Sequence, residues 1–448
     1  MSNRWWHLAT AVILISASVL RASDLDFSDP AKQPPAPAGA VGFPSRDLNL
    51  DVLPGFQNPP AGYGEVGFYW WLGDPLTKER ILWELDQLTG KGISSLQVNY
   101  GHTDIVTKSA YLTIPSDPPL FSADWWNLYD WFLKQAKQRG MAVSLSDYTI
   151  CWAGNGTYTD EMLHEYPEMH GAVLKDRVHD CSGPQICTFE AASTTLAVVA
   201  YKLRGSSVVP GSGIDVRPYI SGGQLRWPAR QGNWRVVEVF VAPEPISLDP
   251  MNPLSGKQLI AKFYQRFEDH NAGESGRGLN FFFSDELQFG VRGWLWNQYF
   301  ADEFRRRKGY DIVPELPALF EDTGPRTPKV RLDYSDVMVS LEEENYFRPV
   351  YEWHRSRGML YGCDRGGRGE DLTEFGDYFR ACRWMTAPGN DQPGLASNLI
   401  KNKVASSMAH LYQRQRCWLE GYYGSGWGTT SAQLVDATWR NFVQGKTC

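Results

Sequence analysis

The chain has 448 residues, of which 42% are hydrophobic and 21% are charged, which is typical of a globular protein rather than a disordered one. This length accommodates a barrel of about 250 residues together with a smaller domain. The 51 acidic residues outnumber the 44 basic ones and give a net charge of −7. With no excess of positive charge to neutralise a phosphate backbone, nucleic acid is not an expected partner.

The first 23 residues have the pattern of a bacterial-type signal peptide. Arg4 supplies a positive start, residues 8–20 are apolar, and Ala22 and Ser23 provide a small-residue exit. We therefore expect a secreted or periplasmic protein, with a retained N-terminal anchor as the alternative. No later segment has the ~18 apolar residues of a membrane span, so no integral membrane segment is expected after cleavage. Residues 24–62, rich in Pro, Ala and Gly, indicate a linker or strap.

Apolar runs and helical patterns alternate through the rest of the chain. Strands are expected at 66–72, 94–100, 142–147, 279–284, 359–363 and 417–422. Helices are expected after the caps Thr77 and Asp124 and at 257–270, 294–307, 336–357, 398–412 and 430–442. Repeated β-α units imply a parallel sheet, and hence an α/β fold of the (β/α)8 TIM-barrel type. Six or seven units are evident, so either a further unit lies in the irregular stretch 309–336 or the barrel is incomplete at its C-terminal end.

Between residues 171 and 248 the pattern changes to short alternating runs separated by Gly, Ser and Pro. This segment predicts an inserted all-β subdomain, which divides the barrel into residues 63–170 and 249–448. Within it, Cys181 and Cys187 flank five residues, a spacing that suits a small disulfide loop in an exported protein. The acidic run 342–344 predicts a solvated helix face.

Two glutamates fall where predicted strands end. Glu286 follows the apolar run at 279–284, and Glu420 lies in the run at 417–422. Active sites of (β/α) barrels form at the carboxyl ends of the strands, and glycosidic bonds are usually cleaved by two carboxyl groups. We predict Glu286 as the acid and Glu420 as the base; the alternative is that each caps a helix or pairs with an arginine. Asp285 is equally suited to be the acid, a metal ligand, or a like-charged neighbour that raises the pKa of Glu286.

A second group of residues at or near predicted strand ends and loops is suited to bind sugar. Aromatic rings would stack on sugar faces, and polar side chains would bond to hydroxyl groups, although core packing and capping are the alternatives. The candidates are Trp71, Tyr100, Trp152, Trp427, Asp147, Asp364 and His410.

Several motifs, taken in order, resemble glycoside hydrolase family 106, the α-L-rhamnosidases. They are Phe68-Tyr69-Trp70-Trp71, Gly90-Lys91-Gly92-Ile93, Phe304-Arg305-Arg306-Arg307, Gly309-Tyr310-Asp311, Ala409-His410-Leu411-Tyr412 and Leu419-Glu420-Gly421. The resemblance implies an inverting hydrolase with Glu420 as general base and a Ca²⁺ ion that touches sugar hydroxyls. It assigns no metal ligands in this chain.

One motif departs from the family pattern. The family often shows Asp-Ser-Tyr/Trp-Glu after the fourth strand, where this chain has Asp285-Glu286-Leu287-Gln288. The usual acid position then holds Gln288, whose amide cannot act as the acid. Either Glu286 has taken the role, with Gln288 left to bind substrate, or the activity is altered or absent.

The sequence therefore predicts a secreted, α-L-rhamnosidase-like glycoside hydrolase that cleaves terminal sugars from an oligo- or polysaccharide. A β-galactosidase-like barrel hydrolase is one alternative, and an inactive carbohydrate-binding relic is another. Carboxyl separation distinguishes the two enzymes, since about 5–5.5 Å indicates retention and about 6.5–9.5 Å inversion. The sugar, its linkage and the oligomeric state are left open.

Overall fold

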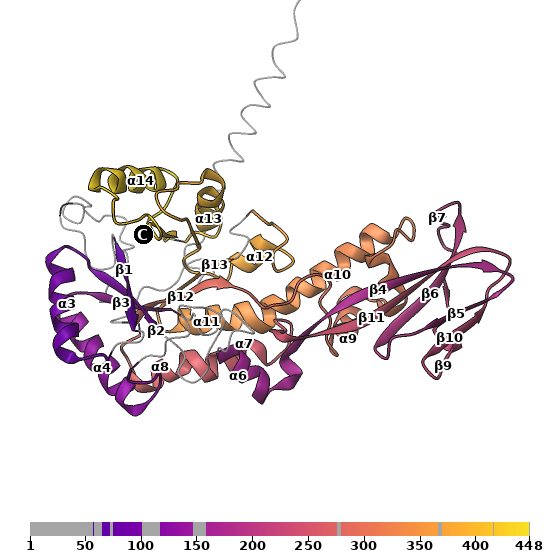
Figure 1. The fold of residues 1–448 in the computed structure, drawn as a ribbon, viewed down its shortest axis with the longest axis horizontal. Coiled ribbons are helices and arrows are strands. Elements are labelled where there is room, and N and C mark those ends of the chain that lie inside the picture. Colours follow the sequence, from indigo (N-terminus) through magenta and orange to yellow (C-terminus); the bar gives the residue numbers. More distant parts are fainter. Residues whose placement is uncertain are drawn as a thin grey trace, which may run out of the picture.

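A computed structural model describes residues 57, 65–71, 75–100, 117–146, 158–275, 279–365, 370–414 and 416–447. Its centre is a five-stranded sheet in the order β1-β2-β3-β12-β13 (Figure 1). The strands are β1 (Val66–Trp71), β2 (Ser95–Tyr100), β3 (Ala142–Ser146), β12 (Leu279–Leu287) and β13 (Leu360–Arg365). All neighbouring pairs are parallel, as the repeated β-α units predict.

Two short parallel strands lie beside β13. They are β14 (Gly389–Asp391) and β15 (Trp418–Glu420). The segment that leads into β14 lies against β13, because the Ala387 N–H donates to the Tyr361 carbonyl at 3.0 Å. The described sheets do not close into a ring. The structure thus shows a mixed α/β fold around a parallel sheet, and a full barrel of the expected (β/α)8 type is not shown.

Helices α3 (Lys78–Gly90) and α4 (Ala123–Gln138) pack beside the first three strands (Figure 1). The predicted cap Thr77 is confirmed, since its side chain accepts a hydrogen bond from the Arg80 N–H at 3.3 Å. The predicted cap Asp124 is wrong. Ser122 caps α4 instead, accepting from the Trp125 N–H at 3.1 Å, and Asp124 falls in the first turn.

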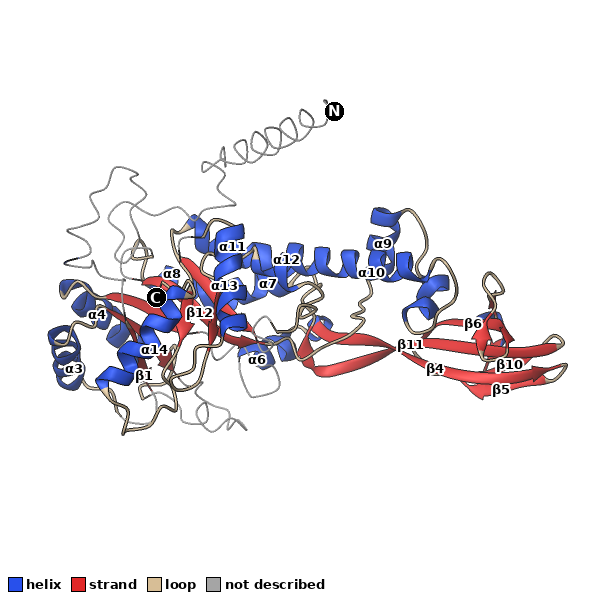
Figure 2. Cartoon of the chain, turned by 90° about the horizontal axis from the view of Figure 1, so that it is seen from above, coloured by secondary structure: helices blue, strands red, loops and turns tan. Residues whose placement is uncertain are grey.

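The remaining helices cover the sheet and extend toward a second lobe (Figure 2). They are α6 (Tyr158–Glu165), α7 (Ser255–Leu259), α8 (Gln265–His270), α9 (Phe300–Lys308), α10 (Thr327–Glu342), α11 (Arg348–Ser356), α12 (Tyr378–Cys382), α13 (Leu399–Leu411) and α14 (Ser431–Val443). Single π-helical turns, Ile260–Tyr264 and Glu343–Phe347, join α7 to α8 and α10 to α11. Short 3-10 turns lie at Pro167–Met169, Arg217–Tyr219 and Val313–Leu319. Within the described residues, no helix is both long and apolar enough to span a bilayer.

The helix expected at 294–307 begins only at Phe300. The backbone before it is tied to the first strand of the second lobe. The Leu174 N–H donates to the Trp294 carbonyl at 2.8 Å, and the Trp296 N–H donates to the Ala172 carbonyl at 2.9 Å. A residue whose N–H and carbonyl pair with a neighbouring strand cannot continue a helix.

Residues 170–248 form the second lobe, an antiparallel β structure (Figure 1). Its strands are β4 (His170–Gly183), β5 (Ile186–Glu190), β6 (Thr195–Arg204), β7 (Ser207–Val208), β8 (Ile214–Asp215), β9 (Ile220–Ser221), β10 (Gln224–Pro228) and β11 (Gly232–Leu248). One sheet has the order β4-β11-β6-β7, with β8 beside β6, and the other has the order β5-β10-β9. Strands β4 and β11 form a long ribbon that runs from the parallel sheet out to the end of the lobe (Figure 2).

Strand β6 is buried on both faces. Val199 and Tyr201 belong to the core that the lobe shares with the rest of the molecule, whereas Val198 and Ala200 pack in the lobe's own core. This alternation is what a strand requires when different layers cover its two sides. One face of this sheet therefore packs in the lobe's own core, and the other face packs in the core shared with the rest of the molecule.

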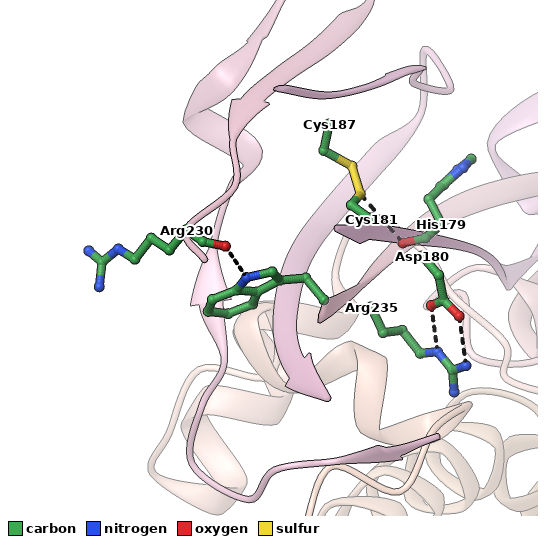
Figure 3. Close-up of a disulfide and its surroundings, with 7 residues drawn as sticks. His179, Asp180, Cys181, Cys187, Arg230 and Arg235 are labelled. Atoms are coloured by element: carbon green, nitrogen blue, oxygen red, sulfur yellow. Dashed lines mark hydrogen bonds and ion pairs between the residues drawn. A yellow bond between two sulfur atoms is a disulfide. The ribbon is translucent and has the colours of Figure 1, made fainter. Parts of the chain in front are cut away.

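The disulfide between Cys181 and Cys187 is confirmed, and it closes the turn between β4 and β5 (Figure 3). Close to it, Asp180 accepts two hydrogen bonds from Arg235, at 3.0 and 3.1 Å. The Trp234 indole N–H donates to the Arg230 carbonyl at 2.7 Å.

The acidic run at 342–344 does not form a solvated face, contrary to expectation. Glu342 and Glu343 are buried. The Glu343 carboxylate pairs with Arg380 at 2.5 Å and with Arg383 at 2.9 Å. These arginines come from the chain around α12, so partners distant in sequence offset the cost of burying the charge.

Candidate active site

The two predicted acids of β12 lie near its carboxyl end. Asp285 and Glu286 directly precede Leu287, the last residue of the strand. Leu287 pairs with Arg365 of β13, and the register between the two strands shifts after Ser284. The backbone thus places both acids at the edge where barrel enzymes carry their active sites. Their side chains lie outside the described residues.

The predicted base, Glu420, is the last residue of β15 and is half-buried. It pairs in register with Asp391, the last residue of β14. Neighbouring strands lie roughly 4.8 Å apart, so the structure brings these two carboxylate residues together at one sheet edge. The Tyr423 hydroxyl donates to the Asp391 carboxylate at 2.5 Å. Asp391 is only 5% exposed, so this bond supplies polar contact to a carboxylate that water barely reaches.

No local sequence pattern marks Asp391 as a site residue. Strand β14 has three residues, and Pro388 and Pro393 stand on either side of it. Such a segment has the composition of a loop. The signal available was a strand-like run at 417–422, which requires a neighbouring strand to pair with.

The indole of Trp418 fixes the position of β14 and β15. It is buried, and its N–H donates to the Ala387 carbonyl at 2.8 Å. Glycines on two strands leave room for the ring. A Cβ atom at Gly389 would lie 2.1 Å from ring carbons, and a Cβ atom at Gly362 would lie 2.5 Å from the ring nitrogen. Side chains at these positions would exclude the indole, so close packing here depends on glycine.

A buried hydrogen-bond network lies around β14. The Gln392 side-chain amide donates to Asn402 at 2.6 Å, and Asn402 in turn donates to Asn441 at 2.5 Å. Lys446 donates to the Asn390 side chain and, at 3.2 Å, to the Trp418 carbonyl. Buried networks whose members are satisfied rigidify the structure around them. We infer that Asp391 and Glu420 are held in a fixed position by the residues that flank them.

The burial of Trp71 corrects its predicted role in sugar binding. The ring has no exposed surface and packs against Trp125, Tyr129 and Phe132, with centroids 5.2 to 6.0 Å apart. It is therefore a core residue. Its neighbour Trp70 is 40% exposed, because consecutive strand residues face opposite sides.

The other predicted sugar-binding residues are dispersed. Trp427 is fully exposed and lines a cavity of about 390 Å³ with Glu65, Tyr422 and Leu434. His410 is exposed in the last turn of α13, and the described contacts do not bring it to Glu420. Gln288 is exposed and lines a separate cavity after β12. The backbones of Tyr100 and Asp364 belong to β2 and β13, but their side chains, and the whole of Asp147 and Trp152, lie outside the described residues.

The family resemblance implies calcium but assigns no ligands in this chain. Among the described residues, no three His, Cys, Asp or Glu side chains gather closely enough to hold a metal ion. We therefore derive no catalytic step through a metal.

Comparison with solved structures identifies a related fold. A rhamnosidase from Novosphingobium sp. PP1Y matches with a TM-score of 0.64 and 13% identity, over 90% of this chain and 56% of that one. The chain has a glycoside-hydrolase-like fold. A β-galactosidase from the Antarctic haloarchaeon Halorubrum lacusprofundi matches over 86% of this chain and 52% of that one, at 11% identity and a TM-score of 0.46. The chain spans little more than half the length of either enzyme.

No protein-family model matches the chain, and no curated protein matches its sequence. The comparisons therefore support a glycoside-hydrolase-like fold, and they do not confirm membership of family 106. Activity and sugar specificity do not follow from a likeness at 13% identity, and they are taken up as proposals.

Proposed function

We propose that this protein is a glycoside hydrolase of the α-L-rhamnosidase type, exported from the cell, that removes terminal sugars from an oligo- or polysaccharide by acid/base catalysis. One observation carries the proposal. Glu420 ends a parallel strand beside a buried, hydrogen-bonded carboxylate, in a fold shared with a rhamnosidase. Export and the requirement for calcium rest on the sequence pattern and the family resemblance alone.

Glu420 is assigned the role of general base. A base in an inverting enzyme must reach a water molecule on one face of the sugar ring. Glu420 is half-buried, so part of its surface is accessible. Its backbone is held by Gln392, the residue after β14, whose N–H donates to the Glu420 carbonyl at 2.8 Å. Removing its charge should therefore affect the reaction far more than the fold.

Glu286 is assigned the role of acid in the leading mechanism. If β12, β13, β14 and β15 are taken as successive neighbours, three steps of roughly 4.8 Å separate β12 from β15, about 14 Å in a flat sheet. Curvature shortens this distance, and two glutamate side chains reaching toward each other shorten it further. A separation of about 6.5–9.5 Å, which leaves room for water and gives inversion, is then accessible.

Asp391 supports a second mechanism. It lies on the strand adjacent to Glu420 and is buried against Tyr423. Carboxyl groups on adjacent strands can approach the separation of about 5–5.5 Å found in retaining enzymes. In that case Asp391 and Glu420 would act as nucleophile and acid/base, and Glu286 would be dispensable.

The test is a kinetic comparison on aryl α-L-rhamnosides, within a panel of other aryl glycosides, with and without calcium. Glu420→Gln should lower kcat by about 10²- to 10⁴-fold, the usual contribution of an acid or base. Glu352→Gln is the matched control, because Glu352 is exposed on α11 and forms a surface ion pair with Arg348 one turn earlier. Its rate should equal that of the wild type.

The variants Glu286→Gln and Asp391→Asn separate the mechanisms. NMR of the first anomer released by the wild type shows whether the reaction inverts or retains configuration. If it inverts, Glu286→Gln should lose activity. If it retains, Asp391→Asn should lose activity. Equal rates for Glu420→Gln and wild type would remove the catalytic proposal. Sugar binding without turnover by the wild type would instead support a carbohydrate-binding protein.

A further inference from the structure

A cavity of about 350 Å³ lies beyond the end of β12. The loop after β12, helix α10 and the segment 371–376 enclose it, and Gln288 is part of its wall. Gln288 stands two residues after Glu286, a distance of roughly 7 Å along an extended chain. The cavity is thus close to the edge of the sheet where the proposed acid is located, yet it is built from other residues.

One part of the cavity wall is aromatic. Phe375 packs on Phe289 and Phe347, with ring centroids 4.9 and 5.7 Å apart. Trp294 packs on Tyr334 at 5.3 Å. Both Phe375 and Trp294 are half-buried, so each ring keeps some accessible surface at the cavity. Flat rings that are only partly covered are suitable platforms for the apolar face of a sugar.

The backbone of Phe375 is unusual. Its φ angle is 55°, in the left-handed region that residues with a side chain seldom adopt. Such conformations cost about 1–3 kcal/mol, persist only where surrounding contacts enforce them, and cluster at ligand-binding sites. Here the packing of Phe375 on two other rings provides that enforcement.

Another part of the wall is polar, and the charged residues described there are mostly acidic. Glu342, Asp371 and Glu374 line the cavity, and Arg292 is the one guanidinium among its described lining residues. Two hydrogen bonds from Thr373, at 2.9 and 2.7 Å, and the nearby Arg292 lower the pKa of Asp371, which keeps it ionised. Carboxylates in excess over cations disfavour uronate, sulfate or phosphate, because the ligand's charge would meet like charges. Sugar hydroxyls, by contrast, can donate to carboxylates and accept from arginine.

We propose that this cavity is a second sugar subsite, which binds a neutral sugar residue of the substrate next to the one that is cleaved. The inference rests on the proposed function and deepens it by defining the substrate as a neutral oligosaccharide. A volume of about 350 Å³ lies at the lower end of the range for small-molecule sites, about 300–1,000 Å³, and suits one or two sugar rings.

The first test compares substrates that do and do not extend into the cavity. Glu374→Gln and Arg292→Met are assayed on an aryl α-L-rhamnoside and on a neutral rhamnosyl-glucose disaccharide, with Glu352→Gln as the control. Each cavity variant removes one or two bonds to sugar hydroxyls. We expect KM for the disaccharide to rise 5- to 10-fold more than KM for the aryl glycoside, with kcat changing much less. The control should not alter this ratio.

The second test measures binding without turnover, by calorimetry on Glu420→Gln. The neutral disaccharide should bind, a rhamnosyl-galacturonate disaccharide should bind at least 5-fold more weakly, and Glu374→Gln added to this background should weaken the neutral ligand. If binding shows this pattern but the wild-type protein hydrolyses none of the substrates, the subsite is supported and the hydrolase proposal is rejected. Hydrolysis with cavity variants indistinguishable from the control would reject the subsite alone. Preference for the uronate would overturn the charge argument.

Discussion

The replacement Gly389→Ala tests whether the fit of Trp418 between two strands holds the candidate site together. The added Cβ atom would lie 2.1 Å from two carbons of the indole, whereas ordinary carbon contacts are about 3.5–4.0 Å. The ring would have to move by more than an ångström. It cannot move toward β13, because Gly362 already lies against its nitrogen there.

The expected loss of stability follows from two effects. Inserting a carbon into a well-packed core costs about 1–3 kcal/mol. Displacement of the ring would also break the hydrogen bond from the Trp418 indole to the Ala387 carbonyl, now 2.8 Å long, which is worth about 1 kcal/mol. We therefore expect Gly389→Ala to lower the free energy of unfolding by about 3 kcal/mol.

Urea unfolding measures this loss, and Gly90→Ala provides the matched control. Gly90 ends helix α3, and a Cβ atom there would meet nothing within 4 Å. Its replacement should change stability by no more than about 0.5–1 kcal/mol, in the favourable direction. In the double variant with Trp418→Leu, the clash disappears. The loss of stability in the double variant should therefore be at least about 1 kcal/mol smaller than the sum of the losses in the two single variants. Additive losses, or a loss from Gly389→Ala no larger than the control's change, would refute the reasoning.

Two further predictions concern the core and the lobe. Burial lowers the pKa of His354 to about 3, against about 6.5 in an unfolded chain, so between these values the unfolded chain binds the extra proton. Stability should then fall as the pH drops below about 6.5, by up to about 1.4 kcal/mol per pH unit, and His354→Gln should flatten this dependence in urea titrations; identical slopes would contradict it. Replacing Cys181 and Cys187 together by serine should cost about 2 kcal/mol, as loop closure predicts for a short loop, with faster amide exchange confined to β4, β5 and their neighbours. Faster exchange spread over the parallel sheet instead would show that the disulfide acts on the whole fold.

The strands of the parallel sheet could be predicted because burial on both faces leaves a continuous apolar run in the sequence. The run at 279–284 is an example, and it became β12 with its acids at the end. Strand β14 could not be predicted in this way. It is held by an indole from β15 and by glycines that admit the indole, so what makes it a strand lies about 30 residues away in sequence.

The candidate site shows the same division. Glu420 could be predicted from its place after an apolar run, whereas Asp391 depends on strand pairing, a non-local event. Trp71 was assigned to the wrong face, because a strand of consecutive aromatic residues gives no sign of which side the helices will cover. The burial of Glu343 likewise depends on Arg380 and Arg383, which no local pattern connects to it.

The hydrophobic core that the lobe shares with the rest of the molecule affects how the protein behaves in solution. Because β6 carries core residues on both faces, the lobe has no layer at which it could swing freely, and the two parts should tumble as one elongated particle (Figure 2). An elongated particle diffuses more slowly than a sphere of equal mass. A single copy should therefore leave a sizing column early, at the position of a heavier sphere, and only a shape-independent weight such as that from light scattering would count the subunits correctly.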